Sequence, residues 1–239
     1  MTSDAEGARR FYGSLFGWTF ETGGAESGFY SMCRVGGNDA AGLGPIPPNN
    51  PMPPAWTVYF SVRDANETCD RVKKAGGTIL MDVMDVMDIG RMAICRDSTD
   101  AVFGIWQPLK RIGATVVGEH GAMAWSEVNS RDADRTQEFY RDVFDLDPRP
   151  LDDPSMKYFM LNQGEEAVAG VMQMTAQWGD IPPHWMPYFA VFNVDAAAEI
   201  VTSNGGQVVH GPFDTPYGRM AVIVDPQGAA LSIIQLAAT

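Results

Sequence analysis

The sequence is poor in the residues on which much recognisable chemistry depends. Its 239 residues include only three cysteines, Cys33, Cys69 and Cys95, which are widely spaced and all lie in the first half. An odd number at such spacing gives neither a disulfide framework nor a CxxC metal or redox motif. We therefore expect buried thiols in a protein of the reducing cytoplasm.

Basic residues are also scarce. Lysine and arginine number 17 against 30 aspartates and glutamates, which gives a net charge of -13. Nucleic acids and anionic membrane surfaces would repel such a chain, so we expect neither as a partner. The sequence also lacks a secretory signal pattern and an apolar run long enough to span a bilayer. Hydrophobic residues nevertheless make up 45% of the chain, which is typical of a globular protein with a proper core.

What the sequence does contain is a repeat of itself. "GRMAICRDSTDAVFGIWQ" at residues 90–107 matches "GRMAVIVDPQGAALSIIQ" at residues 218–235 without a gap. A repeat over this length predicts two domains, residues 1–112 and residues 113–239.

Each half divides further into two units of one strand, one helix and three strands, so the predicted fold class is α+β. "MAWSEVNS" predicts a strand and "RDADRTQEFYRDVF" the helix after it. In the last unit, Asp195 is the predicted N-cap of the helix. "MDVMDVMDIG" at residues 81–90 predicts a solvated loop, because strand alternation would scatter its carboxylates.

The first half begins in the middle of its own repeat. Aligning the copies places Met1 on Asn129, so the first strand of domain 1 is missing from the sequence. We expect Met1 to be an internal methionine of a longer chain, or a wrongly assigned start. If the start is natural, the first sheet is open on one side or takes a strand from another chain, which points to a homodimer. The second domain is therefore the place to look for function.

Paired β-α-β-β-β units with the landmarks "FY…LFGW", "AGG" and "GRMA…D…G" resemble the vicinal oxygen chelate superfamily, which includes glyoxalase I, the extradiol dioxygenases and the bleomycin-resistance proteins. The resemblance covers essentially the whole chain, twice. "PPxW" and "GRMA" in both halves resemble a two-domain glyoxalase-like branch whose members are labelled hydroxylases or antigens. The resemblance implies two cups of curved sheet, with helices outside and a ligand cavity within each cup.

Enzymes of that superfamily generally hold a divalent metal with His, Gln and Glu side chains that point into the cup. The equivalent positions here are Trp125, Met186 and Ser232 in the second domain and Thr57 and Gly104 in the first. None of them is an imidazole or a carboxylate, and the three histidines fall elsewhere. We therefore expect no metal and no other cofactor, although a site built from other carboxylates and carbonyls stays open.

The second cup is expected to carry aromatic and polar side chains. Strand alternation places Trp125, Glu127 and Asn129 on one face, and the ligand-equivalent position makes that face the inward one. Glu127 is then a catalytic acid or base, a ligand anchor, or a structural partner of an arginine such as Arg219. We predict Glu127 as the catalytic residue and the following as ligand-binding residues: Trp125, Asn129, Trp185, Met186, Tyr188, Tyr217, Arg219 and Ser232.

The duplication separates structural from functional candidates. Residues that are polar in one copy only carry more functional information, such as His184 in place of Ala55. Residues kept in both copies are expected to serve the fold, namely Asp97 and Asp225, Trp56 and Trp185, and Arg91 and Arg219.

Three functions stay open, and in each the partner is a small molecule. The first is a metal-independent enzyme that tailors an aromatic or hydrophobic metabolite in the second cup. The second is a sequestering protein of the bleomycin-resistance kind, which binds a flat ligand without chemistry. The third is a metal-dependent lyase or dioxygenase with displaced ligands. Fold-level analogy does not choose between the first two.

Overall fold

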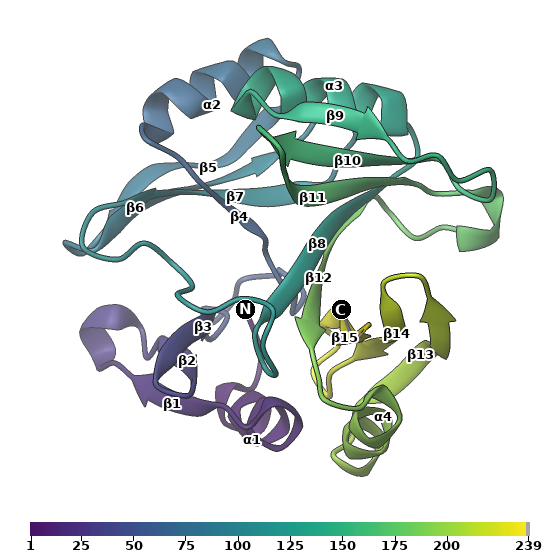
Figure 1. Ribbon diagram of the computed structural model, residues 1–239. Coiled ribbons are helices and arrows are strands. Elements are labelled where there is room, and N and C mark those ends of the chain that lie inside the picture. Colours follow the sequence, from purple (N-terminus) through teal and green to yellow (C-terminus); the bar gives the residue numbers. More distant parts are fainter. Residues whose placement is uncertain (238–239) are drawn as a thin grey trace. The chain divides into compact units, whose positions relative to one another are not determined.

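The computed structural model describes residues 1–237 and confirms the α+β arrangement of strand–helix–strand units (Figure 1). The first half contains α1 (Ala5–Phe16), β1 (Thr19–Thr22), η1 (Ala25–Ser27), β2 (Ser31–Val35), β3 (Asn38–Leu43), β4 (Tyr59–Ser61), α2 (Ala65–Lys74), β5 (Thr78–Val86), β6 (Gly90–Arg96) and β7 (Val102–Pro108). The second contains β8 (Met123–Ser130), α3 (Ala133–Phe144), β9 (Asp147–Pro150), β10 (Tyr158–Gln163), β11 (Glu166–Gln173), η2 (Ala176–Trp178), β12 (His184–Ala190), α4 (Val194–Ser203), β13 (Gln207–Thr215), β14 (Gly218–Val224) and β15 (Ala230–Leu236).

The chain forms two compact units, and each unit takes segments from both halves of the repeat. Unit 1 comprises residues 1–56, 113–125 and 187–237, and unit 2 comprises residues 57–112 and 126–186. Strands β8 and β12 each begin in one unit and end in the other. The division at residues 112 and 113 therefore describes the repeat in the sequence, whereas the compact units combine a piece of each copy.

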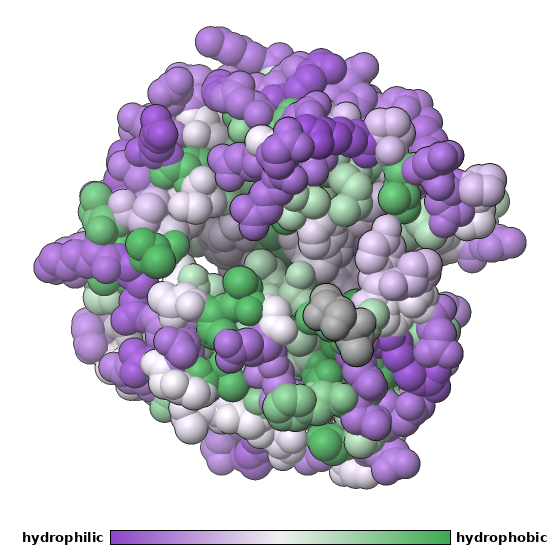
Figure 2. Space-filling model, viewed as in Figure 1, coloured by the Kyte–Doolittle hydropathy of each residue, from purple (hydrophilic) through white to green (hydrophobic). Residues whose placement is uncertain are grey.

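Unit 2 contains two sheet segments. One has the strand order β4-β7-β6-β5, and the other has the order β8-β11-β10-β9, in which β8 runs parallel to β11. Helices α2 and α3 pack against each other and against these strands. Figure 2 shows mostly hydrophilic residues on the outer surface where α2 and α3 lie in Figure 1, so their apolar faces point to the strands.

Unit 1 contains the sheet β1-β2-β3 and the strand order β13-β14-β15-β12. At the place that β8 occupies in the other copy, Thr2 forms a single parallel bridge with Pro45. Its register matches that of Ser130 opposite Gln173 at the end of β8. The short N-terminal segment thus pairs with the residues after β3 as β8 pairs with β11.

Two local predictions are wrong. The N-cap of α4 is Asn193, whose side chain accepts the N–H of Ala196, and not Asp195, which lies in the first helical turn. Either residue type satisfies a helix N-terminus, so the pattern alone left the boundary two residues off. The predicted loop at residues 81–90 belongs to β5 as far as Val86. Pairing with β6 supplies the hydrogen bonds that hold this segment as a strand.

None of the helices within residues 1–237 has the length and apolar character that a membrane crossing needs. The three cysteines are free and buried, as expected. Burial raises the pKa of the Cys95 thiol to about 12, so this thiol stays protonated at neutral pH.

Candidate functional site

Strand β8 has one face in the core of unit 2 and one face turned away from it. Val128 is fully buried in that core beside residues of α3. Because side chains alternate along a strand, Glu127 and Asn129 lie on the opposite face. Register places Gly170 beside Glu127 and Met172 beside Asn129, and Tyr158 beside Met172. We call Glu127, Asn129, Tyr158, Gly170 and Met172 the Glu127 face.

A tyrosine orients the carboxylate of Glu127. The Tyr158 hydroxyl donates a hydrogen bond of 3.0 Å to Glu127 Oε2, and both side chains are buried. A Cβ atom at Gly170 would lie 1.8 Å from the Tyr158 oxygen. The glycine is therefore what allows the tyrosine to lie across β11 and reach the carboxylate.

Asn129 is joined to His184. Its Nδ2 lies 3.3 Å from His184 Nε2, and His184 Nδ1 lies 2.8 Å from the carbonyl oxygen of Pro182. A carbonyl only accepts hydrogen bonds, so Nδ1 carries the proton and Nε2 accepts from the amide. The imidazole ring is also in tilted contact with Trp178, at 6.3 Å between ring centroids. For a neutral ring, Pro182 and Asn129 thus select the tautomer with the proton on Nδ1.

The other two predicted residues of unit 2 differ in their surroundings. Trp185 belongs to the core, where its Nε1 donates 2.7 Å to the Tyr140 hydroxyl and its ring packs on Phe60. Its assignment to the ligand-binding face is therefore corrected, because alternation along β12 turns it to the helix side. Met186, the next residue, is buried and faces the other way.

The remaining predicted residues lie in unit 1. Tyr188 and Ser232 are buried register neighbours on β12 and β15. Tyr217 is exposed at the turn between β13 and β14. Arg219 forms ion pairs with two surface carboxylates, Asp195 of α4 at 2.8 Å and Asp214 of β13 at 3.0 Å. Among the described residues these are its ion-pair partners, so Arg219 is not the arginine partner that the sequence offered for Glu127. Trp125, the last of this set, is partly buried on β8.

The donor set does not fit the metal that the superfamily generally holds. Among residues 1–237, no group of three or more His, Cys, Asp or Glu side chains is placed to hold a metal ion. Ser232, at the position of the usual carboxylate, has a buried hydroxyl without a hydrogen-bond partner among the described residues. The three positions equivalent to metal ligands thus hold a tryptophan, a methionine and a serine, and these side chains do not form a ligand set for a divalent metal.

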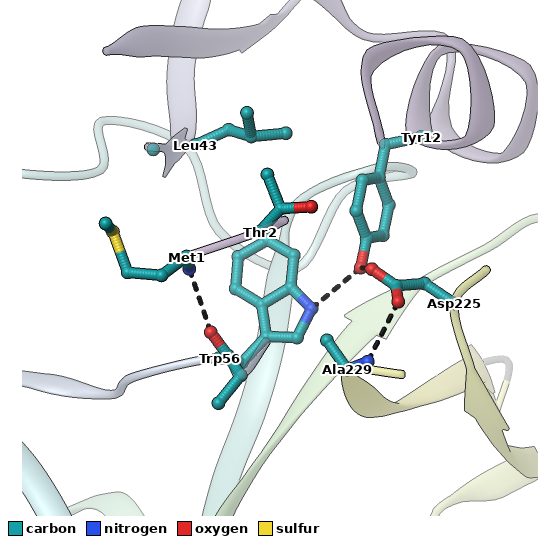
Figure 3. A pocket seen from close by; sticks show the side chains of 9 residues that line it. Met1, Thr2, Tyr12, Leu43, Trp56, Asp225 and Ala229 are labelled. Atoms are coloured by element: carbon teal, nitrogen blue, oxygen red, sulfur yellow. Dashed lines mark hydrogen bonds between the residues drawn. The ribbon is translucent and has the colours of Figure 1, made fainter. Parts of the chain in front are cut away.

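A small cavity in unit 1 lies beside a buried polar cluster. Figure 3 shows the Tyr12 hydroxyl between the Trp56 indole and the Asp225 carboxylate, with distances of 3.0 Å and 2.8 Å. The cavity also touches Met1 and Leu43, and its volume of about 20 Å³ suffices for about one water. It is therefore too small for a metabolite.

Sequence reasoning did not select Tyr158 and gave His184 only a general functional weight. Tyr158 and Gly170 lie in two predicted strands, and alternation assigns each of them to a face of its own strand. Alternation does not show which strands pair, so it could not bring Tyr158 to Glu127. His184 had the signal of replacing Ala55 of the other copy. The contact between His184 and Asn129 depends on how the end of β8 and the start of β12 pack within unit 2, which the sequence does not show.

The sequence is similar to one protein family and to several known proteins. The profile of the Glyoxalase/Bleomycin resistance protein/Dioxygenase superfamily matches residues 1–105 and 120–233. "Putative glyoxylase CFP32" of Mycobacterium bovis is 38% identical over 98% of this chain and 92% of its own length. "Anthracycline biosynthesis protein DauV" of a Streptomyces species is 33% identical over 98% of this chain and 90% of its own length.

Solved structures agree on the fold. The Mn(II)-bound glyoxalase of Novosphingobium aromaticivorans superimposes with a TM-score of 0.66 at 14% identity, over 98% of this chain and 79% of the other. The family profile covers both halves, and the curated relatives cover nearly the whole length. This chain therefore belongs to the glyoxalase/bleomycin resistance protein/dioxygenase superfamily.

Proposed function

We propose that this protein binds a small, planar aromatic or hydrophobic metabolite at the Glu127 face and transforms it by proton transfer without a metal. The observation that carries the proposal is the buried Glu127 carboxylate held by Tyr158 at 3.0 Å, on the side of β8 away from the core. A buried carboxylate costs stability because burial removes its hydration, so a functional role would explain its presence at this face.

Glu127 would act as the general base. Its carboxylate takes a proton from an acidic C–H or O–H bond of the ligand, and the same proton returns to another ligand atom or to water. Tyr158 keeps the carboxylate in place during this exchange, since its hydroxyl donates to Oε2. The step needs no oxidant and no cofactor, and its atoms balance.

Two further observations support the proposal. The equivalents of the family's metal ligands are unsuited to a metal in this chain, which favours chemistry by side chains alone. The name of the relative DauV refers to anthracycline biosynthesis, and anthracyclines contain planar fused rings. Met172 and Trp178 beside the polar groups would contact such a ring.

The test combines binding and turnover with 2-hydroxyanthraquinone as the probe. Thermal shift and fluorescence titration measure binding by the unmodified protein, by Glu127→Gln and by Gly42→Ala as a control in unit 1. The proposal expects saturable binding, retention of binding in Glu127→Gln, and loss in that variant of the exchange of the carbon-bound ring hydrogens next to the hydroxyl, followed by NMR in heavy water. The Gly42→Ala control should retain both.

Other outcomes contradict parts of the proposal. Tight binding without proton exchange, unaffected by Glu127→Gln, would favour a sequestering protein of the bleomycin-resistance kind. Stabilisation by added Mn²⁺ or Zn²⁺ that EDTA reverses would overturn the metal-independent assignment. Absence of saturable binding would reject the Glu127 face as a site for planar ligands.

A further inference from the structure

One acceptor at the Glu127 face has no donor. Asn129 is 1% exposed, and its Oδ1 finds no hydrogen-bond partner among the residues that the structure describes. A buried polar atom without a partner costs about 1–3 kcal/mol in general, so such atoms in folded proteins call for an explanation. The amide of Asn129 is therefore the feature of this face most suited to receive a group from outside.

The orientation of this amide is fixed by its neighbour. The carbonyl oxygen of Pro182 accepts a hydrogen bond from His184 Nδ1, so in a neutral imidazole Nε2 is an acceptor and faces Asn129 Nδ2. Turning the amide over would bring Oδ1 against the lone pair of Nε2, and two acceptors repel each other. His184 thus keeps Nδ2 on its own side and leaves Oδ1 as the end that lacks a donor.

A second acceptor lies on the same face of the strand. Glu127 precedes Asn129 by two residues, which separates their Cα atoms by about 7 Å along a strand. Glu127 Oε2 accepts the Tyr158 hydroxyl, and as a carboxylate the side chain would offer a ligand acceptors only. Together, the two side chains favour a ligand that donates hydrogen bonds and disfavour an anionic ligand.

We infer that the ligand carries a neutral hydrogen-bond donor, a hydroxyl or an amine on its ring, which binds Asn129 Oδ1. This inference rests on the proposed function and narrows its ligand to hydroxylated or aminated aromatic compounds. His184 is then a positioning residue for specificity, because it acts on the ligand through the amide of Asn129.

Four probes that differ at one ring position test the inference. They are 2-hydroxyanthraquinone, 2-aminoanthraquinone, 2-methoxyanthraquinone and anthraquinone-2-carboxylate, titrated at a pH where the hydroxyl is neutral. The unmodified protein should bind the hydroxyl and amino probes about tenfold more tightly than the methoxy probe, which has no donor. The carboxylate probe should bind more weakly still.

Variants assign the discrimination to the amide. Asn129→Ala should bind the hydroxyl and methoxy probes within about twofold of each other, because the acceptor is gone. His184→Ala should reduce the preference while the protein still binds the probes, because the amide can turn over. Ser98→Ala is the matched control: it removes a buried hydroxyl of unit 2 that likewise lacks a partner among the described residues, and should leave the preference unchanged. Circular dichroism and thermal melting show that each variant is folded.

The results separate this inference from the proposed function. If no probe binds saturably, the proposed function fails. If the probes bind but the methoxy compound is as tight as the hydroxyl compound, only the donor requirement fails. A preference that persists in folded Asn129→Ala also overturns the inference. Should Asn129→Ala not fold, Asn129→Leu supplies the same test, because it removes the acceptor and keeps a side chain of similar size.

Discussion

The hydroxyl of Tyr140 lies 2.9 Å from Asp97 Oδ2 in the interior of unit 2, and it accepts the Trp185 indole N–H at 2.7 Å. Unit 1 repeats this arrangement with Tyr12, Asp225 and Trp56. In each case the tyrosine and the aspartate come from different halves of the repeated sequence. The three kept residue types therefore connect the two sequence copies within each unit.

Removing one of these hydroxyls should destabilise the protein. Tyr140→Phe leaves the Asp97 carboxylate and the Trp185 N–H with one partner fewer in a buried place, so we expect a loss of about 2–4 kcal/mol in the free energy of unfolding. Tyr12→Phe should cost a similar amount. Chemical denaturation measures both. Tyr217→Phe, at an exposed tyrosine, should stay within about 0.5 kcal/mol, and equal effects at Tyr140 and Tyr217 would contradict the prediction.

Stability should also depend on pH through Asp97. Burial raises the pKa of this carboxyl above its ordinary 3.8, against the hydrogen bonds from Thr99, Tyr140 and Ala101 that lower it. As pH rises through 3.8, the unfolded chain loses its proton before the folded one, so the free energy of unfolding falls until pH passes the folded-state pKa.

Asp97→Asn should lack this decline, because the amide does not titrate, although it should be less stable at low pH for want of a carboxyl partner for Tyr140. Urea denaturation at a series of acidic pH values gives the slope. Asp195→Asn is the control of opposite sign, since hydrogen bonding to Arg219 lowers the pKa of Asp195 and its stabilisation is lost as pH falls. An Asp97→Asn protein with the same slope as the unmodified protein would refute the assignment.

Gly170→Ala should damage the Glu127 face without altering the backbone. The added Cβ would meet the Tyr158 oxygen at 1.8 Å, so the tyrosine must leave Glu127. We expect about tenfold weaker binding of 2-hydroxyanthraquinone, and a loss of about 1–3 kcal/mol because Tyr158 is buried. Gly42→Ala creates the equivalent contact with the exposed Tyr30 of unit 1 and should leave binding unchanged. Equal binding by the two variants would exclude Tyr158 from the site.

Arg219→Ala should have small effects. Its guanidinium pairs with Asp195 and Asp214 at the surface, where water and salt screen the ion pairs. We expect an unfolding free energy equal to that of the unmodified protein within the error of the measurement, and unchanged probe affinity. Arg91→Ala, which breaks the corresponding pair with Asp85 in the other copy, is the matched variant. A large loss of probe binding in Arg219→Ala alone would restore the arginine to the ligand-binding residues.

The sequence by itself determined the features that depend on near neighbours. The repeat, the order of strands and helices, and the face shared by Glu127 and Asn129 follow from alternation and capping within a few residues. The same local rules could not decide that α4 starts after Asn193, because Asn193 and Asp195 are helix caps of similar strength. They also could not show that residues 81–86 belong to β5, because pairing with β6 holds them in that strand.

Only the tertiary structure decided which copies meet. Two copies of one pattern offer nearly equivalent partners, so periodicity cannot tell whether Tyr140 receives an aspartate from its own half or from the other. Packing brings Asp97 to Tyr140 and Asp225 to Tyr12, turns Trp185 into the core, and lays Tyr158 over Gly170 onto Glu127. These contacts depend on shape over long separations in sequence, and the last of them orients the carboxylate of the candidate site in unit 2.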